Sequence, residues 1–214
     1  MSVGLRISEI FYSLQGESNT VGLPTVFVRL TGCPLRCNYC DTSYAFSGGT
    51  KVPLETIITE IKKYNCNYVC VTGGEPLAQP ACLEFLKKLA DENFNVSLET
   101  SGALDVSGVD ARIVKVLDLK APNSGEMTKN RYENIEFLTT QDQIKFVIAD
   151  NEDYNWSKKM IEEYDLTQRC QVLFSPVVPT QNPTELAEKI LADKLPVRFQ
   201  IQLHKLLWQD AQGK

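Results

Sequence analysis

Residues 25–42 read Thr25-Val-Phe-Val-Arg-Leu-Thr-Gly-Cys33-Pro-Leu-Arg-Cys37-Asn-Tyr-Cys40-Asp-Thr42. The first six residues are rich in β-branched and apolar side chains, which predicts a strand over 25–30. A loop with three cysteines follows directly. In a parallel α/β sheet, the loops after the carboxyl ends of the strands collect the ligands. The stretch therefore predicts a parallel strand that leads into a binding site.

The rest of the chain alternates β-rich apolar runs with segments of helical period, which is the pattern of βαβ units. Further strands are predicted over 68–72, 95–100, 113–119, 143–149, 171–175 and 197–203. Helices are predicted over 54–64, 80–93, 153–164 and 183–193. Pro53 and Pro183 fit first-turn positions, and Asn182 fits a helix N-cap.

Two crossovers, 101–112 and 121–142, are too short or irregular for a good helix, and a complete eight-unit barrel needs about 250 residues. The chain has 214 residues and no linker-like stretch. We therefore expect a single α/β domain over 1–214. Its fold would be an incomplete, curved parallel β/α barrel of about six strands, with some crossover helices missing.

Charge and hydropathy exclude several classes of protein. The net charge is −5, which removes the electrostatic attraction that non-specific nucleic-acid binding depends on. The sequence has neither the start of a secretory signal nor an apolar run of about 18 residues that could span a membrane. These features predict a cytoplasmic protein that binds neither nucleic acid nor membranes.

Seven cysteines without an export signal favour metal or redox chemistry over disulfides. Structural zinc is one alternative, but a closed zinc site needs four ligands and the only histidine, His204, is distant in sequence. The thiolates of Cys33, Cys37 and Cys40 instead suit a [4Fe-4S] cluster with one iron left open. The other four cysteines show no ligand spacing and are interpreted as small buried apolar residues.

The Cys-x3-Cys-x2-Cys spacing after the first core strand resembles the signature of the radical S-adenosylmethionine superfamily. Thr72-Gly73-Gly74-Glu75-Pro76 is similar to its Gly-Gly-Glu-Pro motif, although turn chemistry alone also explains it. The resemblance implies that S-adenosylmethionine occupies the open iron and that its cleavage yields a 5′-deoxyadenosyl radical. The residues that it assigns to this cofactor are Tyr39, Gly74, Glu75, Ser101, Asp118, Lys120 and Ser175.

A second resemblance is more specific. Leu14-Gln15-Gly16-Glu17, Arg29 and the Cys-Asp-Thr sequence ending at Thr42 resemble the 7-carboxy-7-deazaguanine synthase family. That family converts 6-carboxy-5,6,7,8-tetrahydropterin to 7-carboxy-7-deazaguanine by ring contraction with loss of ammonia, in queuosine and 7-deazapurine biosynthesis. The substrate-binding residues that it implies are Leu14, Gln15, Gly16, Glu17, Arg29, Thr72 and His204.

The same resemblance implies a Mg²⁺ ion at Thr42, a substrate-binding segment over about 1–24 and a short extension over about 197–214. It further implies a homodimer and a flavodoxin- or ferredoxin-like electron donor. The sequence departs from the family in two places. Asp118-Leu-Lys120 stands where Ser-Pro-Lys is frequent, and the extreme C-terminus differs. Contacts that the family makes through its extreme C-terminus are therefore not transferred.

The residues alone leave simpler readings open. Asp118 and Lys120 fit a solvated strand end, Arg29 a structural ion pair, Thr42 a turn cap, and His204 a satisfied structural histidine. For the whole chain, the alternatives are a glycyl-radical activating enzyme, which shares the cysteine spacing, and a non-catalytic iron-sulfur or zinc module. A carrier protein normally supplies four cysteines to a cluster.

Overall fold

In the computed structural model, which describes residues 3–209 and 211–214, nine strands form one sheet in the order β3-β1-β2-β4-β5-β6-β7-β8-β9. The strands are β1 Gly4–Leu14, β2 Pro24–Leu30, β3 Thr50–Pro53, β4 Tyr68–Gly73, β5 Asn95–Thr100, β6 Val114–Asp118, β7 Gln143–Ile148, β8 Gln171–Pro176 and β9 Arg198–Phe199. The strands from β2 to β9 are parallel. Because β3 and β9 are the two edges, the sheet is not closed, and the predicted incomplete barrel is confirmed.

The sequence did not predict β1 or β3. The strand β1 runs antiparallel to both of its neighbours, β2 and β3. The strand β1 alternates poorly between buried and exposed positions, and its register shifts between Ile7 and Glu9. A period of two is the main sequence signal of a half-buried strand. The irregular pattern therefore hid β1, although its pairing with β2 completes the sheet.

The helices are α1 Leu54–Lys62, α2 Ala81–Asp91, α3 Asn151–Glu163, α4 Leu166–Arg169, α5 Pro183–Ala192 and α6 Leu203–Trp208. Short 3-10 helices cover Ser43–Phe46, Pro76–Ala78, Pro122–Ser124, Met127–Lys129 and Tyr132–Phe137. The four predicted helices correspond to α1, α2, α3 and α5. Asn182 caps α5 by accepting hydrogen bonds from the amides of Thr184 and Glu185, as predicted. Helix α3 is capped by Asp150 and begins at Asn151, two residues before its predicted start.

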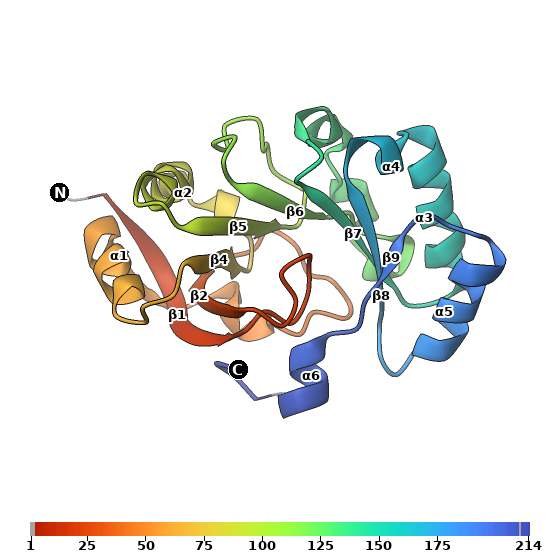
Figure 1. The fold of residues 1–214 in the computed structure, drawn as a ribbon, viewed down its shortest axis with the longest axis horizontal. Coiled ribbons are helices and arrows are strands. Elements are labelled where there is room, and N and C mark those ends of the chain that lie inside the picture. The colour runs from red at the N-terminus through yellow and green to blue at the C-terminus, as the bar shows by residue number, and fades with distance from the viewer. Residues whose placement is uncertain (1–2, 210) are drawn as a thin grey trace.

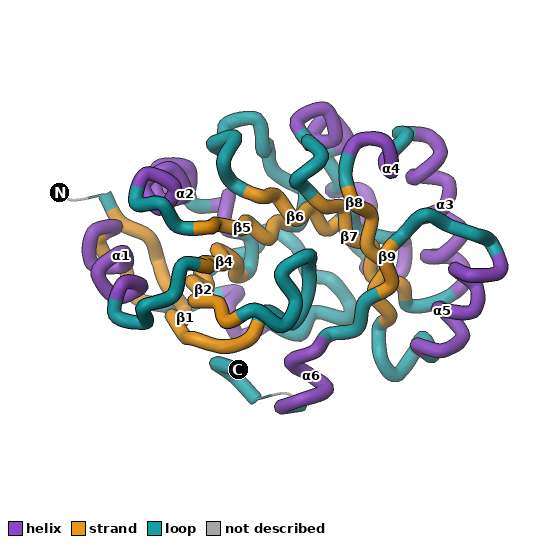
Figure 2. Tube along the Cα trace, in the orientation of Figure 1, coloured by secondary structure: helices purple, strands orange, loops and turns teal. Residues whose placement is uncertain are grey.

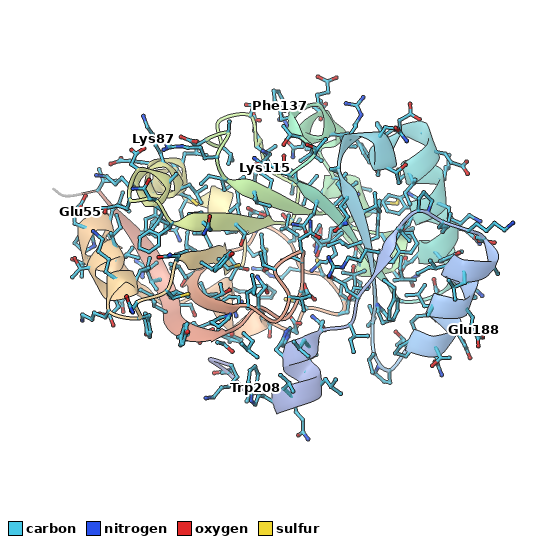
Figure 3. All side chains as sticks on the ribbon, viewed as in Figure 1. Glu55, Lys87, Lys115, Phe137, Glu188 and Trp208 are labelled. Atoms are coloured by element: carbon cyan, nitrogen blue, oxygen red, sulfur yellow. The ribbon has the colours of Figure 1, made fainter. Side chains whose placement is uncertain are left out.

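Helices α1 to α5 lie around the outside of the curved sheet, and α6 lies at its opposite, open side (Figure 1). Glu55, Lys87 and Glu188 point outward from α1, α2 and α5 (Figure 3). Two apolar clusters fill the space between sheet and helices, one beneath α1 and α2 and one beneath α3 to α5. Side chains on the other face of the parallel strands are therefore free to form a site.

The crossover after β5 contains no α-helix, and the crossover after β6 contains only 3-10 turns, as the sequence predicts. The Asn134 side chain links these two crossovers by hydrogen bonds. Its Nδ2 donates to the carbonyls of Gly102 and Leu104, and its Oδ1 accepts from the amide of Val106. This buried side chain thereby joins the two irregular segments.

The predicted strand over 197–203 is largely wrong, because β9 ends at Phe199 and the chain then turns into α6. The amide of Gln200 still donates to the carbonyl of Phe174, but the amide of Leu203 donates to Gly16. The C-terminal segment therefore packs on the N-terminal segment instead of extending the sheet. In the described part of the chain, no helix is long and apolar enough to cross a membrane.

Candidate functional site

A cavity of about 800 Å³ opens at the carboxyl ends of the parallel strands. Its wall is formed by residues of β1 and β2, the cysteine loop, the ends of the parallel strands, α6 and residues 211–214. Loop segments gather on this side of the sheet, between β2 and α6 (Figure 2). The volume is in the range of small-molecule sites.

The cavity brings together nearly all of the site residues predicted from the sequence. Glu75 does not line it. The predicted residues that do are Leu14, Gln15, Gly16, Glu17, Arg29, Cys33, Cys37, Tyr39, Cys40, Thr42, Thr72, Gly74, Ser101, Asp118, Lys120, Ser175 and His204. Residues that are distant in sequence therefore share one wall.

The three cysteines are free and partly exposed to the cavity. Burial is the main cause that raises the pKa of the Cys33 and Cys37 thiols. Among the residues described, no three His, Cys, Asp or Glu side chains form a group ready to hold one metal ion. A [4Fe-4S] cluster makes a different demand, because each cysteine binds its own iron. Three separated thiols on one loop fit such a cluster.

Hydrogen bonds to the β6–β7 crossover hold the cysteine loop. The amide of Asn38 donates to the carbonyl of Ser124 over 3.0 Å, and the amide of Arg36 donates to Glu126 Oε1 over 2.6 Å. The irregular crossover, which lacks a helix, thus supports the loop directly.

The Thr72-Gly73-Gly74 turn lies directly against the cysteine loop. Gly73 has φ +147°, a conformation that L-residues with side chains rarely adopt, and a Cβ on Gly74 would lie 2.3 Å from the Gly32 carbonyl oxygen and 2.8 Å from Cys33 Cβ. The amide of Glu75 donates to that carbonyl over 2.7 Å. Glycine is therefore required for this close backbone approach.

The carboxylate of Glu75 is fully buried. It accepts hydrogen bonds from the Ser101 amide at 2.7 Å, the Thr100 hydroxyl at 2.9 Å and the Leu77 amide at 3.0 Å. Glu75 thereby ties the glycine turn to the end of β5, because buried carboxylate oxygens require donors. Its expected contact with S-adenosylmethionine stays a prediction.

Two buried polar atoms in the cavity wall have no hydrogen-bond partner within the described residues: the Tyr39 hydroxyl and Asp118 Oδ1. The other carboxylate oxygen of Asp118 lies 3.1 Å from Lys120 Nζ. Burial raises the pKa of the Tyr39 phenol far above its ordinary value. Unsatisfied polar atoms of this kind are typical of positions that a bound ligand completes.

Arg29 lies on the opposite part of the wall. Its Nε is 2.6 Å from Glu9 Oε1, and the Tyr44 hydroxyl donates to the same oxygen over 2.7 Å. The guanidinium carbon lies 5.6 Å from the centre of the Phe11 ring. Burial lowers the pKa of Arg29, but the Glu9 and Tyr44 contacts outweigh it and raise the net value. An aromatic cradle thus holds a permanent cation.

Glu99 is a cavity residue that the sequence analysis missed. It accepts hydrogen bonds from Gln15 Nε2 at 3.3 Å and from the Thr72 hydroxyl at 3.0 Å. A charged residue next to the end of an apolar strand was its only signal.

Lys145 was also missed, although it is the only charged residue of β7. Its Nζ lies 2.7 Å from Glu17 Oε2 and 3.4 Å from Asp118 Oδ2. An isolated lysine within an apolar strand is a sequence signal for a cavity-facing position.

The C-terminal helix contacts both the cysteine loop and the N-terminal segment. Asp41 accepts from the Thr42 hydroxyl at 2.9 Å and from Gln202 at 3.2 Å, and it lies 3.0 Å from Lys205 Nζ. His204, predicted at a strand end, is in α6 and packs against Gly16. These contacts close one side of the cavity.

Comparison with known proteins agrees with this arrangement. Residues 27–190 match the model of the radical SAM superfamily. The chain is similar to QueE from Escherichia coli, whose crystal structure covers 94% of this chain and 95% of its own, with a TM-score of 0.78 and 22% identity. It is also similar to Streptococcus suis SuiB bound to S-adenosylmethionine, with a TM-score of 0.55, 13% identity and coverage of 79% and 44% of the two chains. These two likenesses concern the fold.

Relatives in sequence identify the family more specifically than these structures do. The 7-carboxy-7-deazaguanine synthase of Chlorobaculum tepidum is 43% identical over 98% of this chain and 97% of its own. The enzyme of the same name from Koribacter versatilis is 39% identical over 95% and 97%. The likeness extends over nearly the whole chain, and the chain therefore belongs to the 7-carboxy-7-deazaguanine synthase family of the radical SAM superfamily.

Proposed function

We propose that this protein converts 6-carboxy-5,6,7,8-tetrahydropterin to 7-carboxy-7-deazaguanine with loss of ammonia, in the biosynthesis of queuosine and related 7-deazapurines. The observation that carries the proposal is the shared cavity. The cysteine loop, the glycine turn and the Leu14-Gln15-Gly16-Glu17 segment all line it. One small-molecule site therefore holds the features of both resemblances.

Cys33, Cys37 and Cys40 would hold a [4Fe-4S] cluster, and S-adenosylmethionine would lie along the strand ends beside it. When bound, this pair supplies the hydrogen-abstracting radical chemistry of the superfamily. The free Tyr39 hydroxyl and Asp118 Oδ1 would complete their hydrogen bonds with the cofactor. Gly74 leaves room for close backbone contact, and Glu75 holds Ser101 in place.

Arg29 would bind the substrate carboxylate, because Glu9 occupies its Nε and, within the described residues, leaves the terminal nitrogens available. Gln15, Glu17 and Thr72 would contact the polar edge of the pterin, with Leu14, Gly16 and His204 packed around it. The C-terminal helix would help to exclude water from the site. Such fixed positioning accelerates reaction by holding the reacting atoms at short range.

Mg²⁺ is a further proposed component. The Thr42 hydroxyl lines the cavity and lies beside the Asp41 carboxylate. Oxygen donors of this kind suit Mg²⁺, which takes few protein ligands and completes its coordination with water and substrate. The ion would orient the substrate and add positive charge near its reacting end. We also propose a homodimer and an electron donor of the flavodoxin or ferredoxin type.

The test is an anaerobic incubation of reconstituted, reduced protein with S-adenosylmethionine, Mg²⁺ and 6-carboxytetrahydropterin, followed by mass spectrometry. Formation of 7-carboxy-7-deazaguanine, absent with Cys37→Ala, supports the proposal. Cleavage of S-adenosylmethionine without this product would assign another substrate. No cleavage would favour a non-catalytic iron-sulfur protein. A glycyl-radical activating enzyme would instead require a protein substrate.

A further inference from the structure

The contacts of Lys145 connect two parts of the cavity that the family motifs describe separately. Glu17 belongs to the N-terminal segment that the proposed function assigns to the pterin, and Asp118 belongs to the strand ends that it assigns to S-adenosylmethionine. Lys145 Nζ lies 2.7 Å from Glu17 Oε2 and 3.4 Å from Asp118 Oδ2. One ammonium group therefore contacts both the proposed pterin-binding part and the proposed S-adenosylmethionine-binding part of the cavity.

The sheet fixes this position. Lys145 and Asp118 are directly paired across the parallel strands β7 and β6, and both side chains line the cavity. The exposed fractions of the Lys145, Glu17 and Asp118 side chains are 14%, 11% and 17%. Water therefore screens the three charges only weakly.

The charges depend on one another. Burial lowers the pKa of the Lys145 ammonium, but Glu17, Asp118 and Glu99 outweigh this effect and raise the pKa well above its ordinary value. Asp118 has Lys120 as a second cation at 3.1 Å. In the described residues, Glu17 makes its ion pair with Lys145 alone. Removal of Lys145 would leave the Glu17 carboxylate buried without a counter-charge.

We propose that Lys145 is a positioning residue that couples pterin binding to S-adenosylmethionine binding through its shared contacts with Glu17 and Asp118. The inference rests on the proposed function for the identity of the two ligands. A ligand that donates a hydrogen bond to the free oxygen of Asp118 fixes the carboxylate against Lys145. Lys145 in turn fixes Glu17 for the second ligand. Because linkage is reciprocal, each ligand must tighten the other by the same factor.

The experiment measures the dissociation constant of S-adenosylmethionine for anaerobically reconstituted protein, with and without saturating pterin. We expect pterin to tighten binding by about fivefold or more in the unaltered protein, within the usual range of coupling between sites. Lys145→Met should reduce this factor to near one and weaken pterin binding by about tenfold or more, because one buried charge is left unpaired. Lys145→Arg, which keeps the charge, should restore part of the coupling.

Lys115→Met is the matched control. Lys115 lies on β6 (labelled in Figure 3) and is 3.0 Å from Asp142. It is even more deeply buried than Lys145, but it does not line the cavity. It should lower stability and leave the coupling factor unchanged. If Lys145→Met fails to fold, Glu17→Gln and Asp118→Asn each remove one arm of the contact and should each abolish the coupling.

The outcomes separate this inference from the proposed function. Coupling that survives in Lys145→Met, or in either Glu17→Gln or Asp118→Asn, overturns the role of Lys145. The absence of coupling in an unaltered protein that forms product overturns it as well. An unaltered protein that binds S-adenosylmethionine but never forms 7-carboxy-7-deazaguanine contradicts the proposed function instead.

Discussion

Glu9 and Arg29 face each other across the antiparallel pair of β1 and β2, with 2.6 Å between Glu9 Oε1 and Arg29 Nε. The register of the two strands thus determines which edge of the guanidinium is occupied. Tyr44 donates to the same Glu9 oxygen and fixes its position. Arg29 therefore enters the cavity with its Nε already paired.

Glu9→Gln should raise the dissociation constant of 6-carboxytetrahydropterin by about tenfold, because a charge-assisted hydrogen bond contributes roughly 1.5–3 kcal/mol and its loss frees the guanidinium. Titration of reconstituted protein would measure this. Tyr44→Phe removes only the second contact to Glu9 and should have a smaller effect. A pterin without the carboxylate should bind the unaltered protein and Glu9→Gln with equal affinity. Equal weakening for the two pterins would contradict a role in carboxylate binding.

Gly74→Ala should impair cluster assembly, because the new Cβ would lie 2.3 Å from the Gly32 carbonyl and 2.8 Å from Cys33 Cβ. The backbone must shift to relieve this overlap, which moves the cysteine loop. We expect reduced iron content after reconstitution and weakened S-adenosylmethionine binding. Gly108→Ala is the control, since its Cβ would meet only the flexible Leu83 side chain, at 3.1 Å. Full iron loading and unchanged binding in Gly74→Ala would refute this account of the turn.

Gly16→Ala should displace the C-terminal helix, because its Cβ would lie 2.1 Å from His204 Nδ1. Faster hydrogen exchange in α6 and weaker pterin binding are expected. The double variant Gly16→Ala/His204→Ala removes the overlapping ring and should recover slow exchange while pterin binding stays weak. If exchange remains fast in the double variant, the His204 contact is not what holds α6.

Glu75→Gln should lower the free energy of unfolding by roughly 1–3 kcal/mol. The fully buried carboxylate accepts several hydrogen bonds, and an amide side chain cannot accept all of them. Urea denaturation would measure the loss. Leu77 and Ser101 keep their amides, so Glu75→Ala should be worse than Glu75→Gln. A stable Glu75→Gln protein with greatly weakened S-adenosylmethionine binding would instead support direct contact between Glu75 and the cofactor.

The prediction of the fold from the sequence succeeded where the local pattern was strong. Strands β2 and β4 are runs of mostly buried, largely apolar residues, and α5 begins where Asn182 and Pro183 predict. The antiparallel β1 lacked a clear period. The segment 197–203 had strand-like composition, but only Arg198–Phe199 form a strand, and the amide of Leu203 donates to Gly16 where α6 begins. Distant contacts outweighed local propensity there.

The candidate site shows the same division. Cysteines and glycines can be recognised from sequence because their spacing and conformational requirements are local. Glu9, Glu99 and Lys145 belong to no motif. Each is a charged residue on a strand, and which groups it contacts depends on the neighbouring strands. Likewise, the motif around Glu75 gave no indication that its carboxylate accepts hydrogen bonds from Thr100 and Ser101, at the end of β5.

By itself, the sequence determined the parallel α/β architecture, the cysteine triplet and the family resemblance, because hydrophobic period and motif spacing are properties of short stretches. The tertiary structure alone decided that Lys145 contacts both Glu17 and Asp118, and that Glu9 orients Arg29. Charges buried together interact strongly only over a few ångströms. Strand register sets those distances, and no single stretch of the chain contains it.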